Sequence, residues 1–190
     1  MIRVFDAFSK SFLQIKSDLM IFNHFMDTFQ VNKVTCPHCG AKYNCTFFST
    51  YSRNMITFEN RITTCYDLSV TRVICKSCNV THAVLPDILI PFGSYSLSFI
   101  LTTLRAYFLG SKTITYLCDY FQISVSTLYG WIKLFKEQKL LWLGLLEDAL
   151  ISPTKFIDDL LNHLVRVACF YNLTKTSFLQ RFITTHSNSP

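Results

Sequence analysis

Four cysteines stand in two Cys-x-x-Cys pairs, and no other spacing in the chain points as directly to a chemistry. Cys36 and Cys39 form the first pair, Cys75 and Cys78 form the second, and 35 residues lie between the pairs. The two sulfurs of such a turn face the same side, so two turns can supply four thiolates to one tetrahedral ion, which suits Zn²⁺. The sequence therefore predicts a structural zinc site with these four cysteines as ligands.

Disulfides and redox motifs are the alternatives for this spacing. Disulfides need an oxidising compartment, for which the chain carries no export signal, and a redox motif would occur once beside a βαβ pattern. His38 and His82 flank the pairs and could replace one sulfur, although four cysteines already complete a closed site. We interpret Cys45 and Cys65 as small apolar strand residues, with a cross-strand pair or spare ligands left open.

Residues 113–136 have the pattern of a helix-turn-helix, in which two short helices flank a break at Gln122-Ile123-Ser124. Gln122 stands where glycine is usual in such turns. An αα-hairpin inside a helix bundle is the alternative. The residues that should pack the two helices together are Ile114, Leu117, Cys118, Phe121, Ile123, Leu128, Trp131 and Ile132.

A helix-turn-helix presents the start of its second helix to the major groove. Ser124 should cap that helix, and hydroxyl and lysine side chains can then bond bases or phosphates. No Arg or Gln stands on its outer face, so we expect modest base discrimination from this helix alone. The candidate DNA-binding residues are Ser124, Val125, Ser126, Thr127, Tyr129, Lys133, Lys136 and Lys112.

The composition indicates helices with broad apolar faces. Of 190 residues, 50% are hydrophobic, 16% are charged and 18 are Phe, so self-association as a homodimer is expected. A formal charge of +6 permits an anionic partner without requiring one. No apolar run is long enough for a membrane span, and the N-terminus lacks a cleavage pattern, so we expect a cytoplasmic protein with no membrane partner.

The pattern of residues predicts an α+β fold, in which a small antiparallel zinc ribbon joins a mainly helical region containing the helix-turn-helix. A hinge is expected at Leu85–Gly93, and Ser94 or Ser96 should cap a helix that Gly110 ends. Further helices are expected at 139–151, from Ser152-Pro153, and near 174–184, before a frayed tail. The expected segments are 1–30 (helical, mainly over 4–30), 31–85 (zinc ribbon), 86–138 (helix-turn-helix) and 139–190 (C-terminal helices).

The whole arrangement resembles a family of bacterial and mobile-element proteins that combine a zinc ribbon with a helix-turn-helix, and it is similar to the N-terminal DNA-binding part of insertion-sequence transposases. The resemblance covers about 31–138 and implies recognition of double-stranded DNA. It is carried by Cys36-Pro37-His38-Cys39-Gly40, Cys75-Lys76-Ser77-Cys78-Asn79, the segment from Thr81 to Asp87, and Tyr95-Ser96-Leu97.

Catalysis does not follow from this resemblance. A transposase needs a further domain that holds three carboxylates around metal ions. Only 52 of the 190 residues follow Gln138, and their acids come as neighbours, Glu147-Asp148 and Asp158-Asp159, which a helix points about 100° apart. The chain is therefore not expected to be an enzyme.

Two functions remain after this reasoning. The first is a zinc-stabilised DNA-binding regulator or accessory protein of a mobile element, paired through the apolar N- and C-terminal helices. The second is a protein-interaction module, for example an inhibitor that docks through those helices on a host or phage nucleic-acid enzyme.

Overall fold

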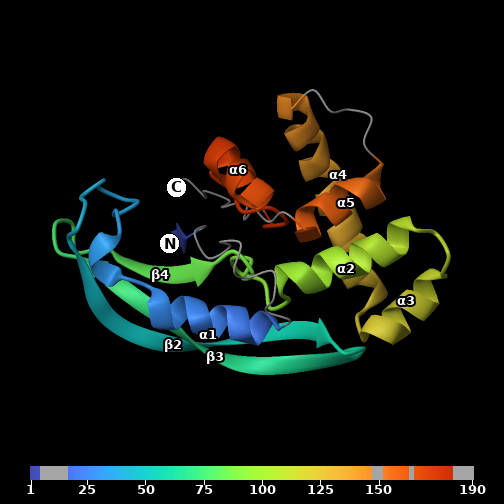
Figure 1. The fold of residues 1–190 in the computed structure, drawn as a ribbon, viewed down its shortest axis with the longest axis horizontal. Coiled ribbons are helices and arrows are strands. Elements are labelled where there is room, and N and C mark those ends of the chain that lie inside the picture. The colour runs from blue at the N-terminus through green and yellow to red at the C-terminus, as the bar shows by residue number, and fades with distance from the viewer. Residues whose placement is uncertain (5–16, 147–151, 163–164, 182–190) are drawn as a thin grey trace, which may run out of the picture.

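The computed structural model describes residues 1–4, 17–146, 152–162 and 165–181, and the predicted α+β class is confirmed (Figure 1). Its sheet has the strand order β1-β4-β3-β2, in which β2, β3 and β4 are antiparallel and β1 joins β4 in parallel. The strands are β1 (Ile2–Val4), β2 (Cys45–Glu59), β3 (Ile62–Cys75) and β4 (Thr81–Pro86). The helices are α1 (Asp18–Thr28), the 3-10 turn η2 (Val31–Lys33), α2 (Leu97–Phe108), α3 (Ile114–Phe121), α4 (Val125–Leu146), α5 (Pro153–Asn162) and α6 (Val165–Thr174).

The hairpin of β2 and β3 is longer than the short strands that the sequence predicts. Its strands have 15 and 14 residues, and they pair from Cys45 opposite Cys75 to Glu59 opposite Ile62. Asn60 and Arg61 both have positive φ, 51° and 65°, as a two-residue hairpin turn requires. Strands of this length span roughly 45 Å, and the two ends of the hairpin lie at opposite ends of the molecule (Figure 1).

α1 covers one face of the sheet. Ile21 and Phe22 pack with Met55, Leu68 and Val70 in the middle of the hairpin. The N-terminal end of α1 is held from the hairpin turn, because the Glu59 carboxylate accepts a 2.9 Å hydrogen bond from the backbone N–H of Asp18. The prediction of helix over 4–30 is wrong at both ends that the structure describes: Ile2–Val4 is a strand, and the helix spans Asp18–Thr28, while 5–16 lie outside the described residues.

The predicted hinge at 85–93 is also wrong, because this segment is part of the core. Leu85, Ile88 and Leu89 are at most 2% exposed and pack under α1. Ile90 belongs to the core of the helical region. The Arg53 guanidinium, from β2, donates hydrogen bonds to the backbone carbonyls of Ile90 and Gly93, the latter at 2.6 Å. The connection between sheet and helices is therefore packed and hydrogen-bonded.

One core holds all the helices from α2 to α6. Phe135 of α4 is fully buried and contacts the rings of Phe108, Phe156 and Phe178. The prediction of a dimer or docking surface rested on the apolar N- and C-terminal helices, but the buried faces of α1, α5 and α6 pack inside the chain. Homodimerisation stays a prediction, without this support.

α4 runs unbroken through the position where the sequence suggests that one helical segment ends and another begins. Gln138 lies inside this helix, fully buried, and its side-chain amide bonds the N–H of Leu179 and the carbonyl of Gln180. α5 begins at Pro153 as predicted. The helix expected near 174–184 is displaced, because α6 ends at Thr174 and no helix follows over 175–181. The expected tail, 185–190, lies outside the described residues.

Across the described part of the chain, no helix is both long and apolar enough to cross a membrane.

Candidate functional site: the four-cysteine centre and the helix pair

The structure brings the four predicted ligand cysteines together. The sulfurs of Cys36, Cys39, Cys75 and Cys78 all lie within 4.8 Å of one another. Two of the distances, Cys36 to Cys78 and Cys39 to Cys75, are 3.7 Å. A tetrahedron with metal–sulfur bonds near 2.3 Å has edges of about 3.8 Å, and a disulfide would need about 2 Å. All eight cysteines are free, so this group can hold a metal ion.

The two cysteine turns have the same backbone geometry. Gly40 donates its N–H to the carbonyl of Cys36 at 2.9 Å, and Asn79 donates to Cys75 at 2.8 Å. Both residues have positive φ, 74° for Gly40 and 56° for Asn79. Glycine takes this conformation without strain and asparagine tolerates it better than most residues, which explains these residue types after each pair.

Backbone N–H groups within each turn point at the sulfurs and divide the four thiols into two kinds. Burial raises the pKa of Cys75, but hydrogen bonds from the N–H groups of Cys78 and Ser77 outweigh it and lower this pKa to about 6. The pKa of Cys36 is lowered in the same way by the N–H groups of Cys39 and His38. These two sulfurs are therefore the first to ionise.

The remaining two thiols hold their protons more tightly. For Cys78 the N–H of Val80 lowers the pKa, but desolvation and hydrogen bonds with the other sulfurs raise it to about 12. The pKa of Cys39 is raised too: the N–H of Ala41 opposes the shift, while desolvation and the neighbouring sulfurs cause it. Four thiolates can coexist here only with a cation among them, because like charges at this distance repel strongly.

His82 lies beside the four sulfurs and not among them. Its Nε2 is 3.3 Å from the sulfur of Cys36, and its Nδ1 is 3.4 Å from the amino group of Met1. Burial, with smaller contributions from the Met1 amino group and His38, lowers the pKa of His82, so the ring is neutral at pH 7. With its proton on Nε2 the ring donates to the sulfur, as partners of metal ligands commonly do. The sequence singled out His82 as a possible ligand and missed this supporting role.

The other two ribbon cysteines are not a pair. Cys45 lies opposite Cys75, whereas Cys65 lies opposite Ile56, far along the hairpin. The alternative of a cross-strand pair is therefore wrong. Cys45 is 3% exposed, and burial, followed by the negative charge of nearby Cys75, raises the pKa of its thiol. It is a protonated, small apolar residue of the strand, as interpreted from the sequence.

The predicted helix pair is present, and its break falls at residues 122–124 as expected. Thr113 caps α3, since its Oγ1 accepts the N–H of Tyr116 at 3.2 Å. Gln122 ends α3 in the left-handed conformation, with φ 54° and ψ 48°. Ser124 caps α4, since its Oγ accepts the N–H of Thr127 at 3.1 Å. The residues predicted to pack the pair are buried, except Ile114, which is half-buried: they are Leu117, Cys118, Phe121, Ile123, Leu128, Trp131 and Ile132.

Most of the candidate DNA-binding residues point to solvent. We use the name outer stripe for the exposed side chains along the first turns of α4, which are Val125, Ser126, Tyr129, Lys133 and Lys136. Ser124 and Lys112 are exposed as well, and the Lys112 ammonium lies 4.8 Å from the centre of the Tyr116 ring. Thr127 differs, because it is half-buried and its hydroxyl is 2.8 Å from that of Ser124.

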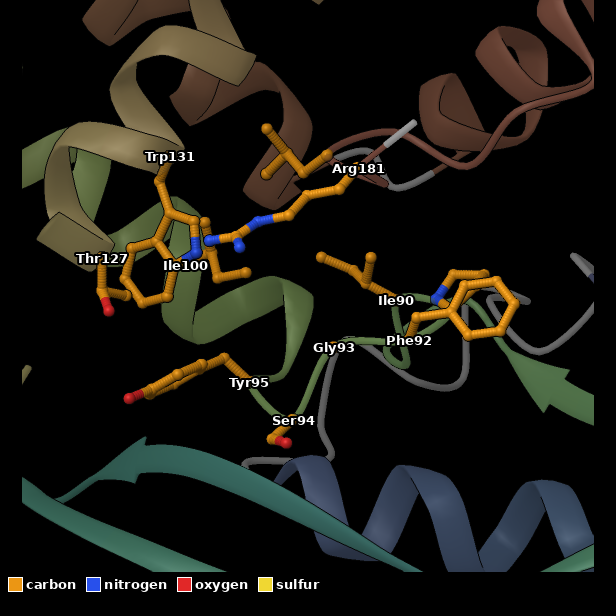
Figure 2. A pocket seen from close by; sticks show the side chains of 11 residues that line it. Ile90, Phe92, Gly93, Ser94, Tyr95, Ile100, Thr127, Trp131 and Arg181 are labelled. Atoms are coloured by element: carbon orange, nitrogen blue, oxygen red, sulfur yellow. The ribbon is translucent and has the colours of Figure 1, made fainter. Parts of the chain in front are cut away.

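A cavity that the sequence analysis did not anticipate lies behind the start of α4 (Figure 2). Its volume is about 330 Å³, and Trp131, Tyr95 and Arg181 line it. A Cβ on Gly130 would stand 3.4 Å from Nη2 of Arg181, so the glycine inside this helix leaves room for the guanidinium. No residue spacing in the sequence connects Arg181 with α4, so the cavity was not predictable.

Residues 36–131 match the protein family described as Domain of unknown function (DUF6431), and the chain belongs to this family. The matched region begins at the first of the four clustered cysteines and ends at Trp131 in α4. It therefore includes all four cysteines, the helix pair and the first part of the outer stripe. Comparison with curated proteins and with solved structures gave no match.

Proposed function

We propose that this protein is a DNA-binding regulator or accessory protein of a mobile element, stabilised by structural zinc and without a catalytic step. In this proposal α3 crosses the DNA backbone and the start of α4 enters the major groove. The similarity of the two cysteine turns and the helix pair to the N-terminal part of insertion-sequence transposases supports duplex DNA, such as an element end or an operator, as the partner.

The observation that carries the proposal is that α4 has two different sides. Its inner side is buried against α3, and its outer stripe is exposed to solvent. The inner residues fix the angle between α3 and α4, whereas the hydroxyl, phenol and ammonium groups of the outer stripe have no covering element among the described residues. Ser126, Tyr129 and Lys133 share one side of the helix, because they are three and four residues apart. Helix-turn-helix proteins read DNA with this part of the second helix.

Zinc is the ion that we propose for the four-cysteine centre. Four thiolates at tetrahedral spacing form a closed site with no open position, which is the structural type of zinc site. The centre thus contributes by holding the cysteine turns and the end of the hairpin in place. Metal analysis of protein purified in reducing buffer should give one zinc per chain.

Duplex binding tests the proposal directly. A pool of random duplexes is selected for binding, and the affinity of the best duplex is measured by fluorescence anisotropy over increasing salt. We expect the affinity to fall steeply, with a slope near −3 on a log–log plot if Lys112, Lys133 and Lys136 each neutralise a phosphate. No binding to any duplex at low salt would overturn the proposal.

The variant Tyr129→Ala/Lys133→Ala assigns the binding to α4. It should weaken binding and reduce the salt slope by about one, because one phosphate contact is lost. Lys155→Ala is the matched control, since it removes the same charge from an exposed position on α5. Equal losses in both variants would show that net charge, not the outer stripe, accounts for binding.

Docking on another protein is the second candidate, and one observation favours it. Tyr116 and Tyr120 are 46% and 38% exposed on α3, and their rings stack at 5.9 Å with an angle of 9°. Exposed tyrosines of this kind are common at protein interfaces. A photo-crosslinking residue at position 116 would separate the candidates, because it should attach to selected duplex under the first proposal and to a protein in cells under the second.

A further inference from the structure

The end of the hairpin that holds the metal centre carries an unusual group of exposed rings. Tyr43 is 74% exposed, Phe47 is 60% exposed and Phe48 is 50% exposed. All three lie within a stretch of six residues: Tyr43 precedes β2, and Phe47 and Phe48 are near the start of this strand, where it pairs with β3. Large apolar rings that stay in water at one place on a protein mark a contact surface.

A β-bulge places two of these rings outside at once. In a regular strand neighbouring side chains point to opposite faces, so only one of Phe47 and Phe48 would face solvent on a sheet with one covered face. Here the pairing shifts between Phe47, opposite Val73, and Ser49, opposite Arg72, which leaves Phe48 as the extra residue. Bulges commonly re-aim side chains next to functional surfaces. Since β2 is also the edge strand, both rings are accessible.

The same end of the molecule is rich in cations and poor in carboxylates. The stretches 28–58 and 68–86 contain no Asp or Glu. Apart from Arg53, which bonds Ile90 and Gly93, their cations are Lys33, Lys42, Arg72 and Lys76, of which the three lysines are exposed. These four positive charges exceed the net charge of about −2 on a zinc ion bound by four thiolates. The end of the hairpin is therefore positive with the metal centre loaded.

Rings and cations are interleaved on this surface. The Arg72 guanidinium lies 5.7 Å from the centre of the Phe48 ring, and it also donates a 3.0 Å hydrogen bond to the hydroxyl of Thr81. The backbone N–H of Lys76 donates a 2.9 Å hydrogen bond to the carbonyl of Asn44, so Lys76 lies beside the segment that carries Tyr43. We name these residues the aromatic–basic surface: Tyr43, Phe47, Phe48, Arg72, Lys42, Lys76 and Lys33.

We propose that the aromatic–basic surface binds single-stranded nucleic acid. Unpaired bases stack on exposed aromatic rings whatever their sequence, while cations between the rings hold the phosphates. A duplex offers no free base faces to these rings, so this partner differs from the duplex proposed for α4. The surface lies at the opposite end of the hairpin from α3, so the two proposals depend on separate residues (Figure 1).

Binding of labelled (dT)₁₂ and (rU)₁₂ to the zinc-loaded full chain, followed by fluorescence anisotropy, tests this. We expect both oligonucleotides to bind, with an affinity that falls as salt rises. The variant Phe47→Ala/Phe48→Ala should weaken binding about 5- to 100-fold, as the loss of base stacking typically does. Binding of (dT)₁₂ alone would identify single-stranded DNA as the partner, and binding of (rU)₁₂ alone would identify RNA. Failure of both to bind at low salt would overturn the inference.

Two further double variants separate stacking from simple apolar contact. Phe47→Tyr/Phe48→Tyr keeps the rings and should keep most of the affinity, whereas Phe47→Leu/Phe48→Leu keeps apolar bulk and should lose it. Wild-type affinity for the oligonucleotides in the leucine variant would contradict base stacking on these rings and overturn the inference. Unchanged zinc content in every variant shows that the fold of the hairpin end is intact.

Duplex binding at α4 can be tested separately from oligonucleotide binding at the aromatic–basic surface. Tyr129→Ala/Lys133→Ala should bind the oligonucleotides as the wild type does while losing affinity for duplex. If it loses affinity for the oligonucleotides equally, single strands bind at α4 and the inference is wrong even though the proposed function stands.

Discussion

The sheet end and the helical end of the molecule are held together by different means. Around the cysteines, the core cluster has eight buried residues in the described part of the chain, three of which are themselves cysteines. The helical end has a cluster of 22 buried residues that includes Phe99, Phe135, Phe156 and Phe178. Because the first end has so little apolar burial, we expect its two irregular turns to need the ion that we propose for the four cysteines. The second end is held mainly by packing of apolar side chains, together with the hydrogen bonds of Gln138.

Metal removal should give the largest loss of stability, and this loss should be confined to the end of the sheet that carries the four cysteines. A structural zinc site stabilises its surroundings by on the order of 10 kcal/mol, so a strong chelator in reducing buffer should unfold the cysteine turns. Backbone amides at Val73 and Val84 should then exchange rapidly with solvent, as measured by hydrogen exchange. Cys75→Ser should do the same without chelator.

The tryptophans provide the control for that experiment. Trp131 and Trp142 both lie in α4, and the chain contains two Trp in total, so tryptophan fluorescence reports only on the helical end. It should be unchanged by chelation. A simultaneous change in fluorescence would show that the two ends unfold together and would remove the contrast between them.

Phe135→Ala should have the second largest effect, at the other end. The Phe135 side chain is surrounded by the core and has 0% solvent exposure. Its truncation should therefore lower the free energy of unfolding by about 3–5 kcal/mol. Urea titrations followed by tryptophan fluorescence should show the shift, while zinc content stays at the wild-type value. Tyr129→Ala, on the exposed side of the same helix, should change stability by less than about 0.5 kcal/mol. Zinc loss from the Phe135 variant would contradict independent ends.

A smaller effect is expected at Asp18, where the two ends meet. Its buried carboxylate accepts a hydrogen bond from Ser98 of α2. Burial raises the pKa of Asp18, hydrogen bonds from Ser96 and Ser98 oppose this, and Glu59 adds to it. The folded protein therefore binds this proton more tightly than the unfolded chain. This contribution to stability is complete below the unfolded pKa near 3.8 and is lost as pH rises through the raised folded pKa.

Asp18→Asn removes the pH-dependent contribution of this carboxyl group to the free energy of unfolding. The stability of this variant relative to the wild type should therefore increase as the pH rises above the unfolded pKa of 3.8, as measured by urea titration at constant zinc. Asp27→Asn, at an exposed carboxylate of the same helix, is the control for the loss of one negative charge. A difference between Asp18→Asn and wild type that is the same at every pH would contradict the assignment.

The features that the sequence predicts well are those fixed by residues close together in the chain. The Cys-x-x-Cys spacing defines the geometry of each turn, and both turns are found with the same hydrogen bonds. The caps at Ser96 and Ser124 and the left-handed residue at Gln122 are likewise local, because a side chain bonds a backbone group three residues away. Their interpretation from sequence needed no knowledge of the rest of the fold.

The predictions that failed concern contacts between distant residues. The segment Leu85–Gly93, with its two prolines, looks like an extended hinge in sequence, but α1 covers part of it and Arg53 bonds its backbone carbonyls. Gln138 looks like the polar end of a helix in sequence. In the structure it is buried, and its side-chain amide forms hydrogen bonds with the backbone of Leu179 and Gln180. The supporting bond from His82 to Cys36 and the length of the hairpin depend in the same way on partners that no local pattern reveals.

The length of the β2–β3 hairpin also fixes the distance between the four-cysteine end of the molecule and α3. Because Arg53 and the buried segment 85–90 fix the helices against the strands, the metal centre and α3 cannot approach each other by bending of the link. Their separation of roughly 45 Å corresponds to about 13 base pairs of B-form DNA at 3.4 Å each. A nucleic acid that touched both ends would therefore follow the protein for slightly more than one helical repeat, and its junction between paired and unpaired strands would lie within that interval.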